Sequence, residues 1–242
     1  MHQSAYDQMA LCVKEYMPVS KRHRVVDLGS RISPGQSLTH RALLANHKID
    51  YVGVDVLDGP NVDRVMSDPY RIPLKSRSAD VVLSGQAFEH IPFFWASIME
   101  IGRVLRPGGH AFITAPSRGN PHDAQDCWRY YPDGFRAMAA YCGLELREAF
   151  TDFPPKKGIR HDYEAIDAKH AYWGDSVGVF RKPRLAPHLP YRISRAIVRE
   201  VTIRWANHIG GVEGIPVPGA IAGRELAGRP KQVPAPAVAG EK

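Results

Sequence analysis

The sequence predicts an α/β protein built around one mostly parallel β-sheet with helices on both of its faces. Two apolar stretches, residues 24–28 and 51–54, have the length and composition of buried strands, and a segment with helical character separates them. Further apolar strands then alternate with amphipathic helices along the chain. This alternation is typical of a parallel sheet, because each parallel connection needs a long crossover, usually a helix.

The first strand, turn and second strand have the plan of a nucleotide-binding βαβ unit. Gly29 lets the backbone approach a ligand closely, and Asp55 ends the second strand, where its carboxylate can accept hydrogen bonds from ribose hydroxyls. The glycine pattern is not that of a dinucleotide site, because Arg31 and Ser33 stand where glycine would be expected. Asp27 would repel a pyrophosphate but suits a cation. A ligand with a ribose, an adenine and a positively charged amino-acid end satisfies both acids.

The other elements follow from apolar periodicity and from turn residues. Ser4 and Asp133 are expected to cap helices, Gly143 to end the second of these, and the turn at residues 107–109 to reverse the chain from helix to strand. The expected helices are residues 4–17, 92–105, 133–141 and 190–207, and the expected further strands are residues 61–66, 79–84, 110–115, 144–150 and 176–181.

Two strings carry a family resemblance. Residues 72–82 read Ile-Pro-Leu-x-x-x-Ser-Ala-Asp-Val-Val, and residues 103–109 read Arg-Val-Leu-Arg-Pro-Gly-Gly. With the first βαβ unit, they resemble the class I S-adenosylmethionine (SAM) methyltransferases, in particular the type 11 methyltransferase-domain group, over roughly residues 24–150. The resemblance implies a Rossmann-like, mostly parallel sheet of seven strands whose last strand is antiparallel, and SAM as the cofactor.

The resemblance also implies a set of cofactor contacts. Asp55 matches the acid that meets the ribose, and Asp68 matches the acid at the third strand end that meets the adenine amino group. The expected cofactor-binding residues are Asp27, Gly29, Ser30, Gly35, Asp55, Val56, Ser67, Asp68, Ser84 and Gln86.

Charge divides the chain into two parts. The net charge is +7, of which residues 183–242 hold +5, so residues 1–182 are nearly neutral. We expect a methyltransferase domain at residues 1–182 and a basic extension at residues 183–242 that is largely disordered after about residue 210. The near-neutral domain argues against nucleic acid as the substrate.

Cysteine usage and hydropathy suggest the compartment. Three cysteines at unrelated spacings form neither a disulfide framework nor a zinc motif, which favours a reducing environment. The sequence shows no apolar run long enough to span a bilayer. We therefore expect a cytoplasmic protein, either a monomer or a homodimer.

Two histidines are candidate general bases for a hydroxyl acceptor, which is a poor nucleophile at neutral pH. His122 is the first candidate, with Asp123 and Asp126 as neighbouring carboxylates that could orient its ring, and His90 beside Glu89 is the second. Solvated side chains of a surface loop are the competing interpretation for His122. His122, Asp123 and Asp126 together could instead hold Mg²⁺, although a metal is not expected.

The acceptor is expected to be a sugar or oligosaccharide, because the loop around residues 126–133 offers flat aromatic faces and hydrogen-bonding groups. This loop is similar to a segment of methyltransferases of bacterial polysaccharide synthesis, and residues 82–95 are similar to enzymes that act on methylated mannose oligosaccharides. The competing interpretation is that these aromatic residues anchor the loop. The expected substrate-binding residues are Asp123, Trp128, Arg129, His161, Tyr163 and Trp173.

Two alternatives stay open at this stage. One is methylation of a lipid-like or quinone-type small molecule, which an apolar acceptor cavity without Trp128 and Arg129 facing it would favour. The other is a nucleic-acid or membrane-surface binding module that uses the basic extension and holds SAM only as a structural ligand.

Overall fold

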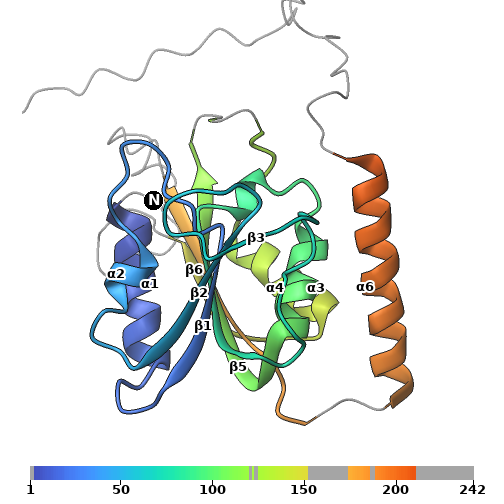
Figure 1. Ribbon diagram of the computed structural model, residues 1–242. Coiled ribbons are helices and arrows are strands. Elements are labelled where there is room, and N and C mark those ends of the chain that lie inside the picture. Colours follow the sequence, from blue (N-terminus) through green and yellow to red (C-terminus); the bar gives the residue numbers. More distant parts are fainter. Residues whose placement is uncertain (1–2, 120–121, 123–124, 152–173, 186–188, 211–242) are drawn as a thin grey trace, which may run out of the picture.

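The computed structural model describes residues 3–119, 122, 125–151, 174–185 and 189–210. Its centre is one seven-stranded sheet in the order β3-β2-β1-β4-β5-β7-β6 (Figure 1). The strands are β1 (His23–Leu28), β2 (Ile49–Asp55), β3 (Arg64–Val65), β4 (Ala79–Gly85), β5 (Leu105–Arg118), β6 (Glu145–Thr151) and β7 (Gly174–Arg181). The expected Rossmann-like fold is confirmed: β7 runs antiparallel to both β5 and β6, while the pairs from β3 to β5 are parallel.

Strand β1 occupies the position that creates a binding crevice. Its register places Asp27 opposite Gly53 of β2 on one side and opposite Leu83 of β4 on the other. The strand order changes direction between β1 and β4, and ligands of open α/β sheets bind beyond the carboxyl ends of the strands at such a point. The residues after Leu28 therefore begin at the mouth of this crevice.

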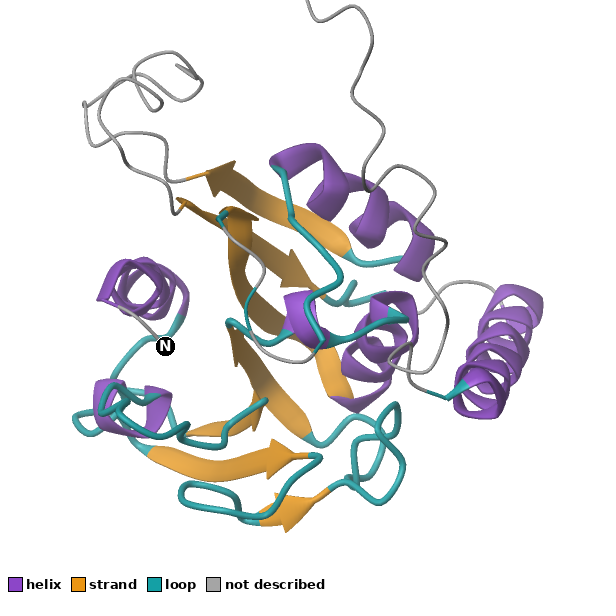
Figure 2. Ribbon diagram, turned by 90° about the horizontal axis from the view of Figure 1, so that it is seen from above, coloured by secondary structure: helices purple, strands orange, loops and turns teal. Residues whose placement is uncertain are grey.

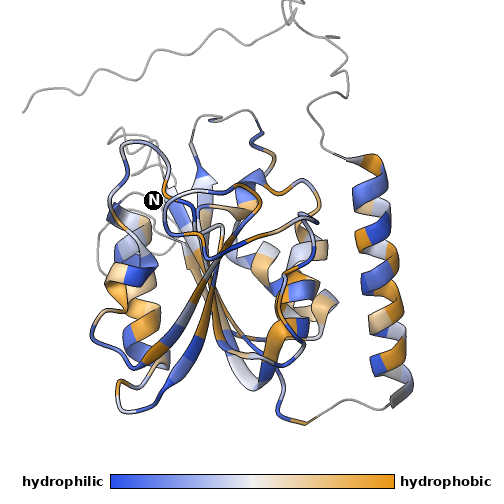
Figure 3. Ribbon diagram, viewed as in Figure 1, coloured by the Kyte–Doolittle hydropathy of each residue, from blue (hydrophilic) through white to orange (hydrophobic). Residues whose placement is uncertain are grey.

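Helices cover both faces of the sheet (Figures 1 and 2). In the described part of the chain they are α1 (Gln3–Tyr16), α2 (His40–Leu43), α3 (Phe94–Val104), α4 (Pro132–Cys142) and α6 (Leu189–Ile209), with the 3₁₀ turn η1 (Phe88–His90). Successive side chains of a strand point to opposite faces. Val25 accordingly packs with Met9 and Val13 of α1, whereas Val26 packs in the core under α3 and α4. Figure 3 shows apolar residues along the central strands and the helix surfaces that face them.

Three local expectations are wrong. Ser4 lies inside α1 instead of capping it, and its hydroxyl donates to the Asp175 carboxylate at 2.6 Å. Tyr131 is the N-cap of α4, so Asp133 lies in the first helical turn. The predicted helical segment after the first turn is only the four residues of α2, because the turn at residues 33–36 delays its start. Thr39 caps this helix, and its hydroxyl oxygen accepts from the Ala42 N–H at 3.1 Å.

Two element boundaries also differ from the prediction. Strand β5 begins at Leu105, five residues before the expected start, and takes in the Pro107-Gly108-Gly109 turn through an irregular register against β4. Only Arg64–Val65 of the expected strand at residues 61–66 pairs with β2. Gly143 ends α4 in the left-handed conformation, as predicted.

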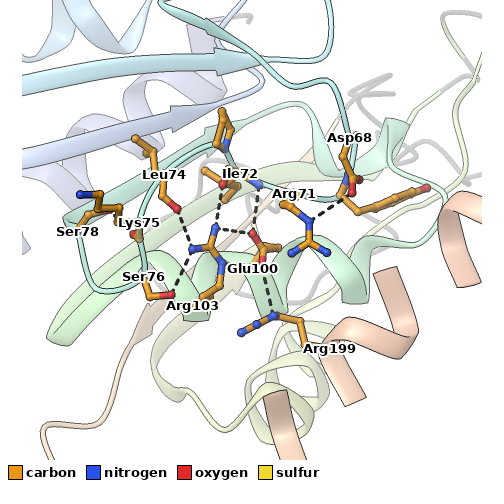
Figure 4. A network of polar contacts seen from close by, with 12 residues as sticks. Asp68, Arg71, Ile72, Leu74, Lys75, Ser76, Ser78, Glu100, Arg103 and Arg199 are labelled. Atoms are coloured by element: carbon orange, nitrogen blue, oxygen red, sulfur yellow. Dashed lines mark hydrogen bonds and ion pairs between the residues drawn. The ribbon is translucent and has the colours of Figure 1, made fainter. Parts of the chain in front are cut away.

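Helix α6 packs against the domain although it lies in the basic extension. Ile203 and Ala206 are buried with Tyr70 and Ala96. The side chain of Arg199 lies 3.3 Å from Glu100, a fully buried carboxylate of α3. Figure 4 shows Glu100 between Arg103 and Arg199 at the centre of this polar network.

Within the described residues, none of the helices has both the length and the apolar character needed to cross a bilayer. The expected sites Asp123, His161, Tyr163 and Trp173, and the extension after residue 210, lie outside the described part of the chain.

Candidate functional site

A cavity of about 900 Å³ lies at the carboxyl ends of β1, β2 and β4. The turn after β1 forms one end, with Gly29 and Asp55 in its wall. The loops after β4 and β5 form the other end, where His90 and His122 line the space. The C-terminal turn of α6 adds Ala206 and Asn207 to the wall, so part of the extension borders the cavity.

Gly29 is required by the close approach of two loops. Its φ is +80°, a conformation that other residues rarely adopt, and a Cβ there would lie 2.5 Å from the Cβ of Ala87. The N–H groups of Gly29 and Ser30 donate to the Val54 carbonyl at 2.9 and 3.2 Å. The turn therefore bends over the end of β2 and brings its backbone to the cavity wall.

Asp55 lines the cavity with a preoriented carboxylate. Its Oδ2 accepts from the Arg31 N–H at 3.0 Å, and its Oδ1 accepts from the Leu57 N–H at 3.1 Å. Each carboxylate oxygen can accept a second hydrogen bond. The side chain is thus held by the backbone in an orientation that leaves acceptor capacity for a vicinal diol.

Asp27 is not an open carboxylate. Only 2% of its surface is exposed, its Oδ1 lies 2.8 Å from the Nδ1 of His40, and its Oδ2 accepts from the Tyr51 hydroxyl. Burial, and then the negative charge of Asp27, raise the pKa of Tyr51, which stays a hydrogen-bond donor. The sequence predicted that Asp27 would face the positively charged end of the ligand. In the structure its carboxylate is already in contact with two protein side chains.

His40 is a cavity residue that sequence reasoning missed. Its ring lines the cavity and is buried, and among the described residues its Nε2 has no hydrogen-bond partner. The Nδ1 contact with Asp27 fixes the orientation of the ring. His40 lies eleven residues after Gly29 and belongs to no recognisable sequence motif. Only the fold shows that its side chain lies beside the end of β1.

The other expected cofactor residues divide into two groups. Asp27, Gly29, Ser30, Asp55, Val56 and Gln86 line the cavity, whereas Gly35, Ser67, Asp68 and Ser84 do not. Ser84 is buried and donates to the Leu28 carbonyl at 2.9 Å, so it ties β4 to β1. Asp68 accepts from the Tyr70 N–H at 2.9 Å, and Tyr70 itself forms the wall.

The end of the cavity formed by the loops after β4 and β5 contains a cluster of three titratable side chains. Glu89, His90 and His122 each offer an oxygen or nitrogen atom, and these atoms all lie within 4.8 Å of one another. The two rings meet edge to face at 4.8 Å between centroids. Glu89 is fully buried, and neither of its oxygens accepts a hydrogen bond from the described residues. Burial raises the pKa of Glu89 to about 8.

Asp126 is the described carboxylate that lies beside the His122 ring. Its Oδ2 lies 2.9 Å from the Nδ1 of His122, and Arg129 pairs with both of its oxygens. Burial of this carboxyl favours its neutral form, but the hydrogen bonds from Arg129 and from the His122 N–H outweigh that effect and hold the pKa of Asp126 at about 2. The carboxylate is therefore ionised at neutral pH.

Trp128 and Arg129 do not line the cavity, contrary to the expectation of an acceptor wall. The Trp128 indole N–H donates to the carbonyls of Ile91 and Pro92 at 3.1 and 3.0 Å, and its ring packs edge to face on Phe94. The guanidinium of Arg129 is engaged by Asp126. Both residues anchor the loop through these contacts within the protein.

Comparison with known proteins agrees with the fold. Residues 31–113 match a family described as a methyltransferase domain. The chain is 31% identical over 102 residues to a phthiotriol/phenolphthiotriol dimycocerosates methyltransferase of Mycobacterium ulcerans. The matched region covers 38% of this chain and 36% of the relative. It is 24% identical over 136 residues to the malonyl-[acyl-carrier protein] O-methyltransferase of Serratia marcescens, covering 50% and 53% of the two chains.

A solved structure shares the fold at low sequence identity. The phosphoethanolamine N-methyltransferase 2 of Haemonchus contortus, in complex with SAM, superposes with a TM-score of 0.53 at 17% identity, covering 73% of this chain and 52% of that one. Residues 31–113 therefore resemble a methyltransferase domain, and the fold is that of class I SAM-dependent methyltransferases, whose cofactor is SAM. It spans about a third to a half of the length of the two curated relatives.

Proposed function

We propose that the protein is an O-methyltransferase that transfers the methyl group of SAM to a hydroxyl of a small-molecule or oligosaccharide acceptor. One observation carries this proposal: a single cavity joins the end at Gly29 and Asp55 to the end at His90 and His122. Methyl transfer needs the acceptor oxygen in line with the sulfonium methyl group, and such positioning supplies much of the rate. A cavity of about 900 Å³ has room for the cofactor and the reacting part of an acceptor.

At the cofactor end, Asp55 is proposed to bind the ribose hydroxyls through its remaining lone pairs. The amino-acid end of SAM then lies toward β1, where the Asp27–His40 pair forms the wall. We assign the Nε2 of His40 to a polar group of that end, because a buried ring nitrogen without a partner is costly until a ligand satisfies it.

At the acceptor end, His122 is proposed to accept the proton of the acceptor hydroxyl. The ionised carboxylate of Asp126 holds its ring and stabilises the imidazolium that forms. The acceptor oxygen forms a bond to the methyl carbon, and S-adenosylhomocysteine leaves with the electron pair of the broken carbon–sulfur bond. His90 is the second candidate for this role, because its ring lies against that of His122.

A sugar acceptor is the first candidate on sequence grounds. A specific observation favours a second candidate, a hydroxyl on a lipid-like molecule: Trp128 and Arg129, the expected sugar contacts, turn into the protein. Apolar side chains such as Leu28, Ile32 and Ile91 line the cavity, and a curated relative at 31% identity acts on phthiotriol-type compounds by its name.

Methyl-labelled SAM distinguishes the two acceptor classes. We expect the purified protein to transfer label either to methylated mannosides or to long-chain hydroxy compounds such as phenolic diols, with formation of S-adenosylhomocysteine. Strong SAM binding without transfer to any hydroxyl compound would support the binding-module alternative. Truncation for that comparison should follow Gly210, because α6 packs on the domain and borders the cavity.

A further inference from the structure

The cluster at the acceptor end has the composition of a transition-metal site. Glu89 supplies carboxylate oxygens and His90 and His122 supply ring nitrogens, with ligand atoms within 4.8 Å of one another. Two imidazoles and one carboxylate are a common ligand set for divalent transition metals, and such a set leaves coordination positions open for a substrate. The set differs from the oxygen-rich trio of His122, Asp123 and Asp126 that the sequence suggested for Mg²⁺.

The carboxylate of this cluster lacks the partners that a structural acid would have. Glu89 is fully buried, and both of its oxygens are without a hydrogen-bond donor among the described residues. Its Oε1 lies 3.6 Å from the Nε2 of His90. A buried carboxylate is costly unless it is paired or coordinates a metal. A cation between Glu89 and the two rings would supply the missing partner.

The outer contact of the His90 ring is the one expected around a metal ion, and the His122 ring lies beside a carboxylate. The Nδ1 of His90 lies 2.6 Å from the Gln125 carbonyl, and the Gln125 side chain returns a hydrogen bond to the His90 carbonyl at 2.7 Å. The Nδ1 of His122 lies 2.9 Å from Asp126. Metal-ligating histidines characteristically donate their other ring N–H to a backbone carbonyl or carboxylate, which fixes the tautomer with its lone pair on Nε2.

We propose that Glu89, His90 and His122 bind one divalent transition-metal ion, of the class of Zn²⁺, Mn²⁺ or Co²⁺, at the acceptor end of the cavity. The ligand atoms are a carboxylate oxygen of Glu89 and the Nε2 atoms of both histidines. The role of the ion rests on the proposed function: it would bind the acceptor hydroxyl as a Lewis acid and stabilise the alkoxide, whose proton passes to water. His122 then holds the ion, so it cannot also accept that proton on the same nitrogen.

Cobalt is a suitable probe, because Co²⁺ in a protein site gives visible absorption bands. Untagged protein is stripped with a chelator and titrated with Co²⁺, both by absorption and by calorimetry. We expect saturation at one equivalent per chain. Glu89→Gln and His90→Ala should remove this binding, and Asp126→Asn, which only loosens the orientation of His122, should weaken it about 10–100-fold. His208→Gln, a histidine on the exposed surface of α6, is the matched control and should bind as the unaltered protein does.

SAM calorimetry on the stripped protein separates this inference from the proposed function. Intact SAM binding with no saturable Co²⁺ binding would overturn the metal site alone. Co²⁺ binding that is unchanged in Glu89→Gln, with the variant folded as judged by its SAM affinity, would also overturn it. Absence of SAM binding would instead contradict the proposed function and leave the Co²⁺ titration as an independent test of the site.

Discussion

The two ends of the cavity differ in how their acids are satisfied. At the cofactor end, Asp27 pairs with His40 and Tyr51, and Asp55 accepts from two backbone N–H groups. At the acceptor end, Glu89 is buried with both oxygens lacking a donor among the described residues. The cofactor end is thus preorganised by the protein itself, whereas the acceptor end holds a group that needs a proton or a cation.

The difference has a structural origin. The cofactor end is built on the carboxyl ends of β1 and β2, where the sheet register fixes Asp27 and Asp55 relative to each other. The acceptor end is built on loops, and side chains hold those loops together. Gln125 joins them through two contacts with His90, and Trp128 does so through the carbonyls after η1. Substitutions should therefore affect cofactor affinity at one end and turnover at the other.

The largest effect is expected for His122→Ala. Loss of a general base, or of a metal ligand, should lower kcat by about 10²–10⁴-fold, because either role acts on the acceptor hydroxyl. SAM affinity measured by calorimetry should change little, since the Asp55 end is untouched. A variant with full turnover would shift the role to His90.

Asp55→Ala should weaken SAM binding on the order of a hundredfold. In the proposed complex the carboxylate accepts a hydrogen bond from each of the two ribose hydroxyls. A hydrogen bond to a charged group contributes about 1.5–3 kcal/mol to the binding free energy. Asp58→Ala, an exposed acid of the same loop, is the matched control and should bind normally. Unchanged affinity in the Asp55 variant would remove this residue from the site.

His40→Asn tests the missed contact at the cofactor end. Asparagine can keep a donor near the Nδ1 position for Asp27 but has no group at the Nε2 position. We expect SAM affinity to fall about tenfold, the effect of one hydrogen bond, with little change in thermal stability. His40→Gln, which places its amide near the Nε2 position, should bind better than His40→Asn, and the reverse order would contradict the assignment.

Trp128→Phe should have the smallest effect on function. The substitution removes the hydrogen bond from the indole N–H to the Ile91 and Pro92 carbonyls, which is worth about 1 kcal/mol of folding stability. We expect a slightly lower Tm with an unchanged acceptor KM. A large rise in acceptor KM at unchanged Tm would restore Trp128 as a substrate contact.

The contrast between the two ends also explains what the sequence could predict. The positions of Asp55 and Gly29 in the cavity wall were predictable because strand ends and turn glycines have local signatures that the parallel sheet then brings together. His40 was missed because its partner, Asp27, is fixed only by the tertiary path of the chain. The magnesium alternative from the sequence included Asp126, whose carboxylate is engaged by Arg129, a contact that spacing alone does not reveal.

The acceptor residues were the hardest to predict. Aromatic and basic side chains in a loop suit a sugar and suit loop anchoring equally well, and Trp128 and Arg129 have the second role in the structure. His122 and His90 were proposed as alternatives, yet the fold places their rings in contact. The sheet brings together loops that are far apart in the sequence. The distance in space between two loop residues therefore cannot be inferred from their separation in the sequence.

The most direct test of the central claim is a crystal structure of the protein with S-adenosylhomocysteine. The account predicts the ribose hydroxyls on Asp55, the amino-acid end beside His40, and the sulfur facing the cluster of Glu89, His90 and His122. Electron density that places the nucleoside elsewhere, or that turns the sulfur away from this cluster, would contradict it.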